Sequence, residues 1–157
     1  MTRAWISAGS NVDRERNIRQ AIHRLAREFG ELVLSPVYRT RAEGFEGDDF
    51  LNLIIGIDTE LPPEALRQRL RAIEDSQGRV RGENRFASRT LDLDLLTWGD
   101  LVDGNQGIPR DEILRYAFVL RPLAEVAPDE RYPGREETYA GLWKAFPDKP
   151  EMVPVVL

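Results

Sequence analysis

The chain has 157 residues, of which 41% are hydrophobic, so it is long enough to fold as one compact domain and too short for two domains of ordinary size. Its formal net charge is −5, which argues against a general nucleic-acid binder. It contains no cysteine and one histidine, His23. This excludes disulfides and thiolate metal sites, and leaves hard cations such as Mg²⁺, held by oxygen ligands, as the metals to expect.

The start of the chain lacks the apolar core of a signal peptide, and no apolar run approaches the ~20 residues of a membrane span. The acidic balance gives no reason to expect nucleic acid as a partner. The sequence therefore predicts a cytoplasmic protein without membrane or nucleic-acid partners, and we expect it to be a monomer.

Apolar periodicity predicts six elements in the order strand, helix, strand, strand, helix, strand. Each helix has apolar residues along one face, and the third strand is apolar enough to be buried on both faces. This order is the ferredoxin-like βαββαβ arrangement, in which both helices cover one face of an antiparallel sheet. The expected ranges are residues 3–9, 13–30, 32–38, 50–59, 62–78 and 89–96.

The C-terminal third is less periodic. It predicts a short helix within 109–116, an apolar segment at 118–126 and a last helix at 139–146. These pieces could cover the second face of the sheet, which gives an α+β fold with a three-layer αβα arrangement in a single domain, residues 1–157. The polar segment 39–49 is long enough to be a flap.

Residues 89–96 read Arg-Thr-Leu-Asp-Leu-Asp-Leu-Leu. In a strand, the alternating leucines would face the core, and Asp92 and Asp94 would share the other face about 7 Å apart. Strands disfavour aspartate, so this pair calls for a compensating partner, most simply a hard cation. The alternative is an edge strand with two solvated acids.

The preceding segment, residues 78–89, has four arginines and one glutamate in an otherwise acidic protein, which suits a polyphosphate. The alternative is solvated surface charge. Metals held by Asp92 and Asp94 would bridge phosphate oxygens while arginines neutralise the rest, as phosphoryl transfer requires. The sequence contains no Gly-x-x-x-x-Gly-Lys-Ser/Thr loop, which excludes a P-loop enzyme.

The segments Gly78-Arg79-Val80-Arg81 and Arg89-Thr90-Leu91-Asp92-Leu93-Asp94 together resemble the signature of the 6-hydroxymethyl-7,8-dihydropterin pyrophosphokinase family. The resemblance implies an ATP-dependent enzyme of folate biosynthesis that transfers pyrophosphate from ATP to the pterin, giving AMP and the pterin diphosphate. It also implies a ferredoxin-like fold and two Mg²⁺ ions. Four further segments resemble the family in the same order: Gly9-Ser10-Asn11, Tyr38-Arg39-Thr40, Phe50-Leu51-Asn52 and Phe118-Val119-Leu120-Arg121-Pro122-Leu123.

The resemblance further implies the roles of individual residues. Asp92 and Asp94 match the family's metal ligands, and with Arg79 and Arg89 they form the implied catalytic set. The implied ATP-binding residues are Glu74, Arg79, Arg81, Arg89, Arg110 and Arg115. The implied pterin-binding residues are Thr40, Glu43, Phe50, Asn52, Phe86 and Phe118, of which Phe118 stacks on the ring.

Several positions depart from the family pattern. Arg110 follows Pro109 where the family has histidine, and Tyr116 stands where the family has arginine, although Arg115 is adjacent. Phe86 replaces a tryptophan, and residues 41–43 are Arg-Ala-Glu where the family has proline and an apolar residue. These departures suggest that Arg110 and Arg115 take over contacts with phosphate and that the choice of pterin differs.

Two alternatives stay open. The first is a divergent paralogue that binds a pterin or nucleotide and has altered or lost catalysis, which the departures from the family pattern favour. The second is a ferredoxin-like RNA-binding module. The acidic charge and the lack of an Arg/Lys-Gly-Phe/Tyr segment that would carry stacking aromatics argue against it.

Overall fold

The computed structural model describes residues 1–41, 48–78 and 91–157. Within them no helix is both long enough and apolar enough to cross a membrane. The elements are β1 (Thr2–Ser10), α1 (Arg14–Phe29), β2 (Val33–Leu34), β3 (Val37–Thr40), β4 (Phe50–Thr59), α2 (Pro63–Ser76), β5 (Asp92–Trp98), the 3-10 turn η1 (Gly104–Gln106), α3 (Glu112–Arg115), α4 (Ala117–Val126), α5 (Tyr139–Ala145) and β6 (Val153–Val155).

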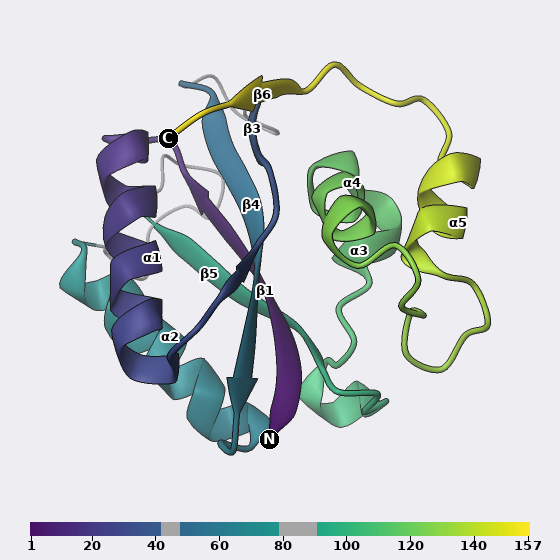
Figure 1. Cartoon of the computed structure of the whole chain (residues 1–157), viewed down its shortest axis with the longest axis horizontal. Helices are drawn as coiled ribbons and strands as arrows, with labels where there is room; N and C mark the ends of the chain where they lie inside the picture. The colour runs from purple at the N-terminus through teal and green to yellow at the C-terminus, as the bar shows by residue number, and fades with distance from the viewer. Residues whose placement is uncertain (42–47, 79–90) are drawn as a thin grey trace.

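The strands form one antiparallel sheet in the order β5-β1-β4-β3-β6, with β2 also paired to β4. The central ladder joins β1 and β4 over nine residue pairs, from Thr2 opposite Thr59 to Ser10 opposite Leu51. Helices α1 and α2 lie on one face of the sheet, and α3, α4 and α5 lie on the other (Figure 1). The predicted ferredoxin-like α+β fold with three layers is therefore confirmed.

Alternation along β1 supplies a core on each side of the sheet. Ala4, Ile6 and Ala8 point into the core beneath α1 and α2, whereas Trp5 points into the core beneath α3, α4 and α5. Successive residues of a strand point to opposite faces, so a strand covered on both sides must be apolar at nearly every position. The same requirement explains the almost continuous apolar run of β4, as the sequence analysis expected.

The single strand predicted at 32–38 is interrupted. The structure has two short strands there, β2 and β3, separated by Ser35 and Pro36. Pro36 has no N–H to donate to a ladder. Ser35 keeps the chain attached to β4, because its N–H donates to Ile54 O at 3.0 Å and its Oγ accepts from Ile54 N at 2.7 Å.

The end of the chain forms a strand that the sequence analysis did not predict. Residues Val153–Val155 pair with β3, with Val155 opposite Val37 and Val153 opposite Arg39. The run is only three residues long and contains a proline, so it carries no periodic signal. By pairing with β3, it covers an edge that would otherwise expose unpaired backbone groups.

Gly56 tests the packing of the core around Trp5. A Cβ at this position would lie 2.6 Å from Cζ3 of the buried Trp5 ring, which is its partner across the β1–β4 ladder. We expect Gly56→Ala to lower the free energy of unfolding by about 1–3 kcal/mol through overpacking, measured by urea denaturation. Gly104→Ala is the matched control, because a Cβ there meets no atom within 4 Å. Equal unfolding midpoints for the two variants would contradict this account.

Candidate active site

The acidic strand lies at one edge of the sheet, where β5 pairs with β1. Its leucines at 91, 93 and 95 belong to the core beneath α1 and α2, which confirms the predicted alternation. Asp92 and Asp94 lie on the opposite face of the strand and line a polar pocket of about 210 Å³. The other charged residues that line this pocket are Arg67, Arg71, Glu74 and Arg110.

Asp94 has a strongly perturbed pKa. Burial, with the neighbouring charges of Asp92 and Glu112, raises the pKa of Asp94 to about 7, and the Arg110 guanidinium opposes this rise. Burial and neighbouring negative charge therefore disfavour the ionised form of Asp94, and a hard cation bound at this edge would favour it. The described residues contain no group of three or more His, Asp or Glu side chains able to hold a metal, so further ligands would have to come from elsewhere.

Glu74 ties helix α2 to the acidic strand. It lies on the helix beside the buried Leu70 and Ile73, and only 4% of its surface is exposed. Its Oε2 accepts a hydrogen bond of 2.7 Å from the backbone N–H of Leu93. The carboxylate thus satisfies a backbone donor of the edge strand between the two aspartates.

Arg110 and Arg115 occupy different places. The backbone N–H of Arg110 donates to Leu96 O at 2.9 Å, and its guanidinium pairs with Glu112 beside the acidic pocket. Arg115 is exposed, pairs with Asp111 at 3.3 Å, and is not among the described residues that line the pocket. Of Arg110 and Arg115, both expected at ATP, the structure brings only Arg110 to the aspartates.

Two arginines of this pocket were missed by the sequence analysis. Arg67 and Arg71 precede Glu74 on α2 by seven and three residues, so all three lie along one side of the helix. That spacing is visible in the sequence. It could have identified both arginines once Glu74 was assigned to the site.

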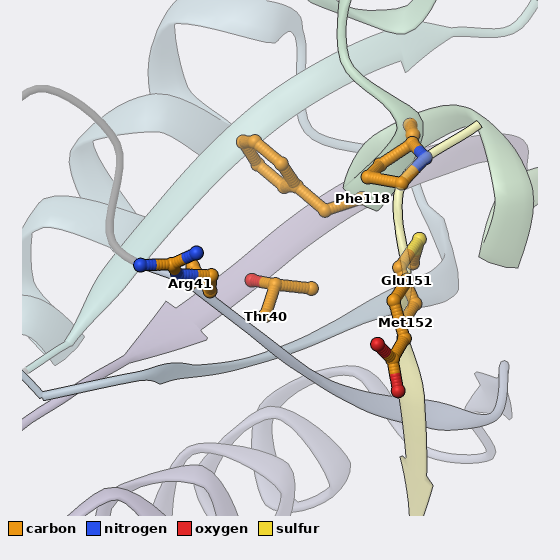
Figure 2. Close-up of a pocket in the computed structure, with 7 residues that line it drawn as sticks. Thr40, Arg41, Phe118, Glu151 and Met152 are labelled. Atoms are coloured by element: carbon orange, nitrogen blue, oxygen red, sulfur yellow. The ribbon is translucent and has the colours of Figure 1, made fainter. Parts of the chain in front are cut away.

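A second pocket, of about 370 Å³, lies between β3, the start of α4 and the C-terminal segment. Figure 2 shows Thr40 in its middle, with Arg41 on one side and the C-terminal chain on the other. Phe118 lines this pocket, and its ring stacks on Tyr116 with centroids 5.2 Å apart. The lining residues are Thr40, Arg41, Ala117, Phe118, Pro150, Glu151 and Met152.

Asn52 lies behind this pocket in β4. It is buried, and its Nδ2 donates to Thr40 Oγ1 at 2.6 Å. Gly9 faces it across the β1–β4 ladder, where a Cβ would lie 2.8 Å from Asn52 Oδ1 and 3.7 Å from Phe50 Cδ1. The glycine therefore leaves the space that the Asn52 amide occupies.

The register of the sheet aligns the two pockets. Gly9 is opposite Asp92 on one side and opposite Asn52 on the other, and Asn52 is opposite Tyr38. Directly paired residues project from the same face of a sheet, and neighbouring strands lie about 4.8 Å apart. Asp92 and Asn52 therefore lie on one face, about 10 Å apart, in a single row across the sheet.

Tyr38 joins β3 to α4 at the end of this row. Its hydroxyl donates to Glu125 Oε1 at 2.5 Å, and the Arg121 guanidinium lies 4.6 Å from the centre of its ring. Burial, reinforced by the hydrogen bond to Glu125, raises the pKa of Tyr38 to about 12. The bond fixes the spacing between the strand that carries Thr40 and the helix that carries Phe118.

Five of the expected site residues cannot be placed. Glu43, Arg79, Arg81, Phe86 and Arg89 lie outside the described residues. Six of the described members line the two pockets: Glu74, Asp92, Asp94 and Arg110 line the first, and Thr40 and Phe118 line the second. Asn52 is bonded to Thr40, and Phe50 lies beside Gly9.

The fold and this row of side chains define an α+β protein of the ferredoxin-like class with two adjacent pockets on one sheet. The model of the 7,8-dihydro-6-hydroxymethylpterin-pyrophosphokinase family matches residues 5–128. The chain belongs to this family.

Curated relatives agree with this assignment. The chain is 40% identical over 135 residues to the 2-amino-4-hydroxy-6-hydroxymethyldihydropteridine pyrophosphokinase of Methylorubrum extorquens, covering 82% of this chain and 85% of that protein. It is 39% identical over 141 residues to the protein of the same name from Pseudomonas aeruginosa, covering 83% and 84%.

A solved structure supports the fold. The HPPK-DHPS of Plasmodium falciparum crystallised with pteroate superposes with a TM-score of 0.72 at 13% identity. The match covers 91% of this chain and 42% of that longer chain. At this identity the likeness is evidence for the fold alone.

The Tyr38–Glu125 bond gives a prediction for stability. We expect Tyr38→Phe to lower the free energy of unfolding by about 1–1.5 kcal/mol at neutral pH, measured by urea denaturation. Because the pKa of Tyr38 is higher in the folded protein, the protonated hydroxyl stabilises the fold fully below about pH 10. As the pH rises from about 10 to about 12, the unfolded chain loses this proton first, and the stabilisation is lost. The difference between wild type and variant should therefore narrow above pH 10. A constant difference across this range would contradict the assignment.

Proposed function

We propose that this protein transfers pyrophosphate from ATP to 6-hydroxymethyl-7,8-dihydropterin, giving AMP and the pterin diphosphate, a step of folate biosynthesis. Relatives at 39–40% identity are named as pyrophosphokinases of this pterin. The observation that carries the proposal is the row across the sheet that sets Asp92 beside Gly9 and Asn52. This row supports the proposal, because it would bring the proposed ATP pocket and the proposed pterin pocket close enough for one reaction.

The acidic pocket is proposed to bind ATP. Asp92 and Asp94 would hold Mg²⁺, with two ions expected, and phosphate oxygens would complete the coordination that two carboxylates leave open. Bound there, the metal would neutralise charge on the phosphate chain. Arg110, held in place by Glu112 and the backbone of Leu96, offers guanidinium donors to phosphate oxygens. The proposed ATP-binding set is Glu74, Arg79, Arg81, Arg89, Arg110 and Arg115, to which the pocket adds Arg67 and Arg71.

The second pocket is proposed to bind the pterin. A flat heteroaromatic ring gains from stacking on Phe118. Asn52 Nδ2 donates a hydrogen bond to Thr40 Oγ1, and within the described chain no hydrogen bond to Asn52 Oδ1 is found. It is thus a buried acceptor suited to a ring N–H, and it would reject analogues that lack the donor. The proposed pterin-binding set is Thr40, Glu43, Phe50, Asn52, Phe86 and Phe118.

The reaction follows from positioning. The hydroxyl oxygen of the bound pterin would attack the β-phosphorus of ATP in line with the leaving α-phosphate oxygen, so that one P–O bond forms and one breaks, and the hydroxyl proton is released. Holding both substrates on one sheet face removes most of the entropic cost of bringing them together. Arg79 and Arg89 complete the proposed catalytic set with the two aspartates.

The setting of the reaction is part of the same proposal. The protein would act as a monomer in the cytoplasm, without nucleic-acid or membrane partners. The net charge of −5 supports the lack of a nucleic-acid partner, since a protein with a net negative charge repels a polyanion at long range.

The first test is formation of AMP from ATP, Mg²⁺ and 6-hydroxymethyl-7,8-dihydropterin. We expect turnover by the wild type and its loss in Asp94→Ala, with Asp100→Ala, an exposed aspartate in the turn after β5, as the matched control. Folding of each variant is checked by circular dichroism. Wild-type protein that is folded and binds the pterin without producing AMP would instead support the divergent paralogue, in which Arg110 has replaced the family's histidine.

Gly9 tests the pterin half of the site. We expect Gly9→Ala to displace the Asn52 amide, which would lie 2.8 Å from the added Cβ, and so to raise the KM for the pterin. A rise of about tenfold corresponds to a loss of about 1.4 kcal/mol. The KM for ATP should stay near the wild-type value, and Gly104→Ala should change neither constant. If the folded Gly9→Ala protein has an unchanged KM for the pterin, the proposed role of Asn52 in pterin binding is wrong.

A further inference from the structure

The wall of the second pocket that comes from the C-terminal segment lies outside the part of the chain that the family model matches. The family model matches residues 5–128, whereas Pro150, Glu151 and Met152 line the pocket from the chain that follows. Figure 2 shows Glu151 and Met152 beside Thr40, on the side opposite Arg41. The segment therefore reaches a site whose other described walls come from β3 and the start of α4.

Strand pairing explains why the segment lies there. In the ladder between β6 and β3, Val153 is opposite Arg39. Continuing this antiparallel register by one residue brings Met152 alongside Thr40. The pairing of β6 with the edge of β3 thus places Met152, the residue before β6, at the pocket.

Met152 is the buried member of this segment. Only 6% of its surface is exposed, and it forms a cluster with Tyr38 and Ala117 against which Phe118 packs. A methionine fills irregular apolar space and makes favourable contacts between its sulfur and aromatic rings. The ring of Tyr116, the N-cap residue of α4, also stacks on the Phe118 ring.

We propose that Met152 is a positioning residue for the pterin: it holds the Phe118 ring in the orientation that stacks on the substrate. This inference rests on the proposed function, because it assigns the second pocket to the pterin. Removing the methionine side chain would leave a space behind Phe118, so that the ring gains freedom that pterin binding must then remove.

The competing explanation is purely structural. If Met152 only anchors β6 to β3, its truncation would lower stability and leave the kinetic constants of the folded protein unchanged. The two explanations therefore differ in whether the KM for the pterin changes separately from the KM for ATP.

The test measures both KM values, kcat and the melting temperature for Met152→Ala, with Met152→Leu as the conservative replacement. Val156→Ala is the matched control, because Val156 follows β6 and is 97% exposed. We expect Met152→Ala to raise the KM for the pterin about tenfold, the size of effect that loss of one aromatic contact produces. The KM for ATP should be unchanged, Met152→Leu should restore the KM for the pterin, and Val156→Ala should resemble the wild type.

Each outcome decides the inference. An unchanged KM for the pterin in folded Met152→Ala overturns it, as does a parallel rise in both KM values. If Met152→Ala does not fold, Met152→Val removes fewer atoms and carries the same comparison at smaller amplitude. Wild-type turnover is measured first, so a failure of the proposed function is separate from a failure of this inference. If the wild type binds the pterin without turnover, the dissociation constants for the pterin and an ATP analogue replace the two KM values.

Discussion

The register of β1 between its two neighbours is the constraint on which the site depends. Because Gly9 is opposite both Asp92 and Asn52, the acidic edge strand and the amide of β4 project from the same face in one row. A shift of one residue in either ladder would turn the aspartates or the amide toward the core beneath α1 and α2. The apolar alternation of β1 and β5 opposes a shift by one residue, which would turn the leucines of β5 away from the core beneath α1 and α2 and turn the acids into it.

The row also explains why small and charged residues occur inside an otherwise apolar sheet. Because Gly9 has no side chain, the Asn52 amide can occupy the space that a Cβ would fill. Burial beside Asp92 and Glu112 raises the pKa of Asp94 and is opposed by Arg110, so the edge of the sheet stores an unfavourable concentration of negative charge. Groups with strongly perturbed pKa values in a cleft are common at sites that bind a ligand or perform chemistry.

The sequence predicted most of the fold because its long elements are strongly periodic. The alternating aspartates and leucines from Asp92 onward lie in β5, the apolar run of 50–59 forms β4, and both strands pack as expected. It did not predict β6, whose three residues carry no period, or the break at Pro36, which depends on how Ser35 bonds to β4. These features are set by tertiary contacts rather than by local preference.

For the site, residue types and family-like spacing identified the carboxylates, and the structure added how they are held. Three features join segments that are far apart in the sequence: the bond from the Leu93 N–H to Glu74, the row of paired residues through Gly9, and the lining of the second pocket by Met152. No single-segment pattern contains such information. Arg110 and Glu112 pair within one short segment, and the bond from the Arg110 backbone N–H to Leu96 O brings that pair to β5.

A crystal structure of the protein with Mg²⁺, a non-hydrolysable ATP analogue and the pterin tests the central claim most directly. The account predicts metal density on Asp92 and Asp94, the pterin stacked on Phe118 with a ring N–H donating to Asn52 Oδ1, and the pterin hydroxyl oxygen about 3–3.5 Å from the β-phosphorus. A pterin bound elsewhere, or phosphates that do not approach the aspartates, would contradict it.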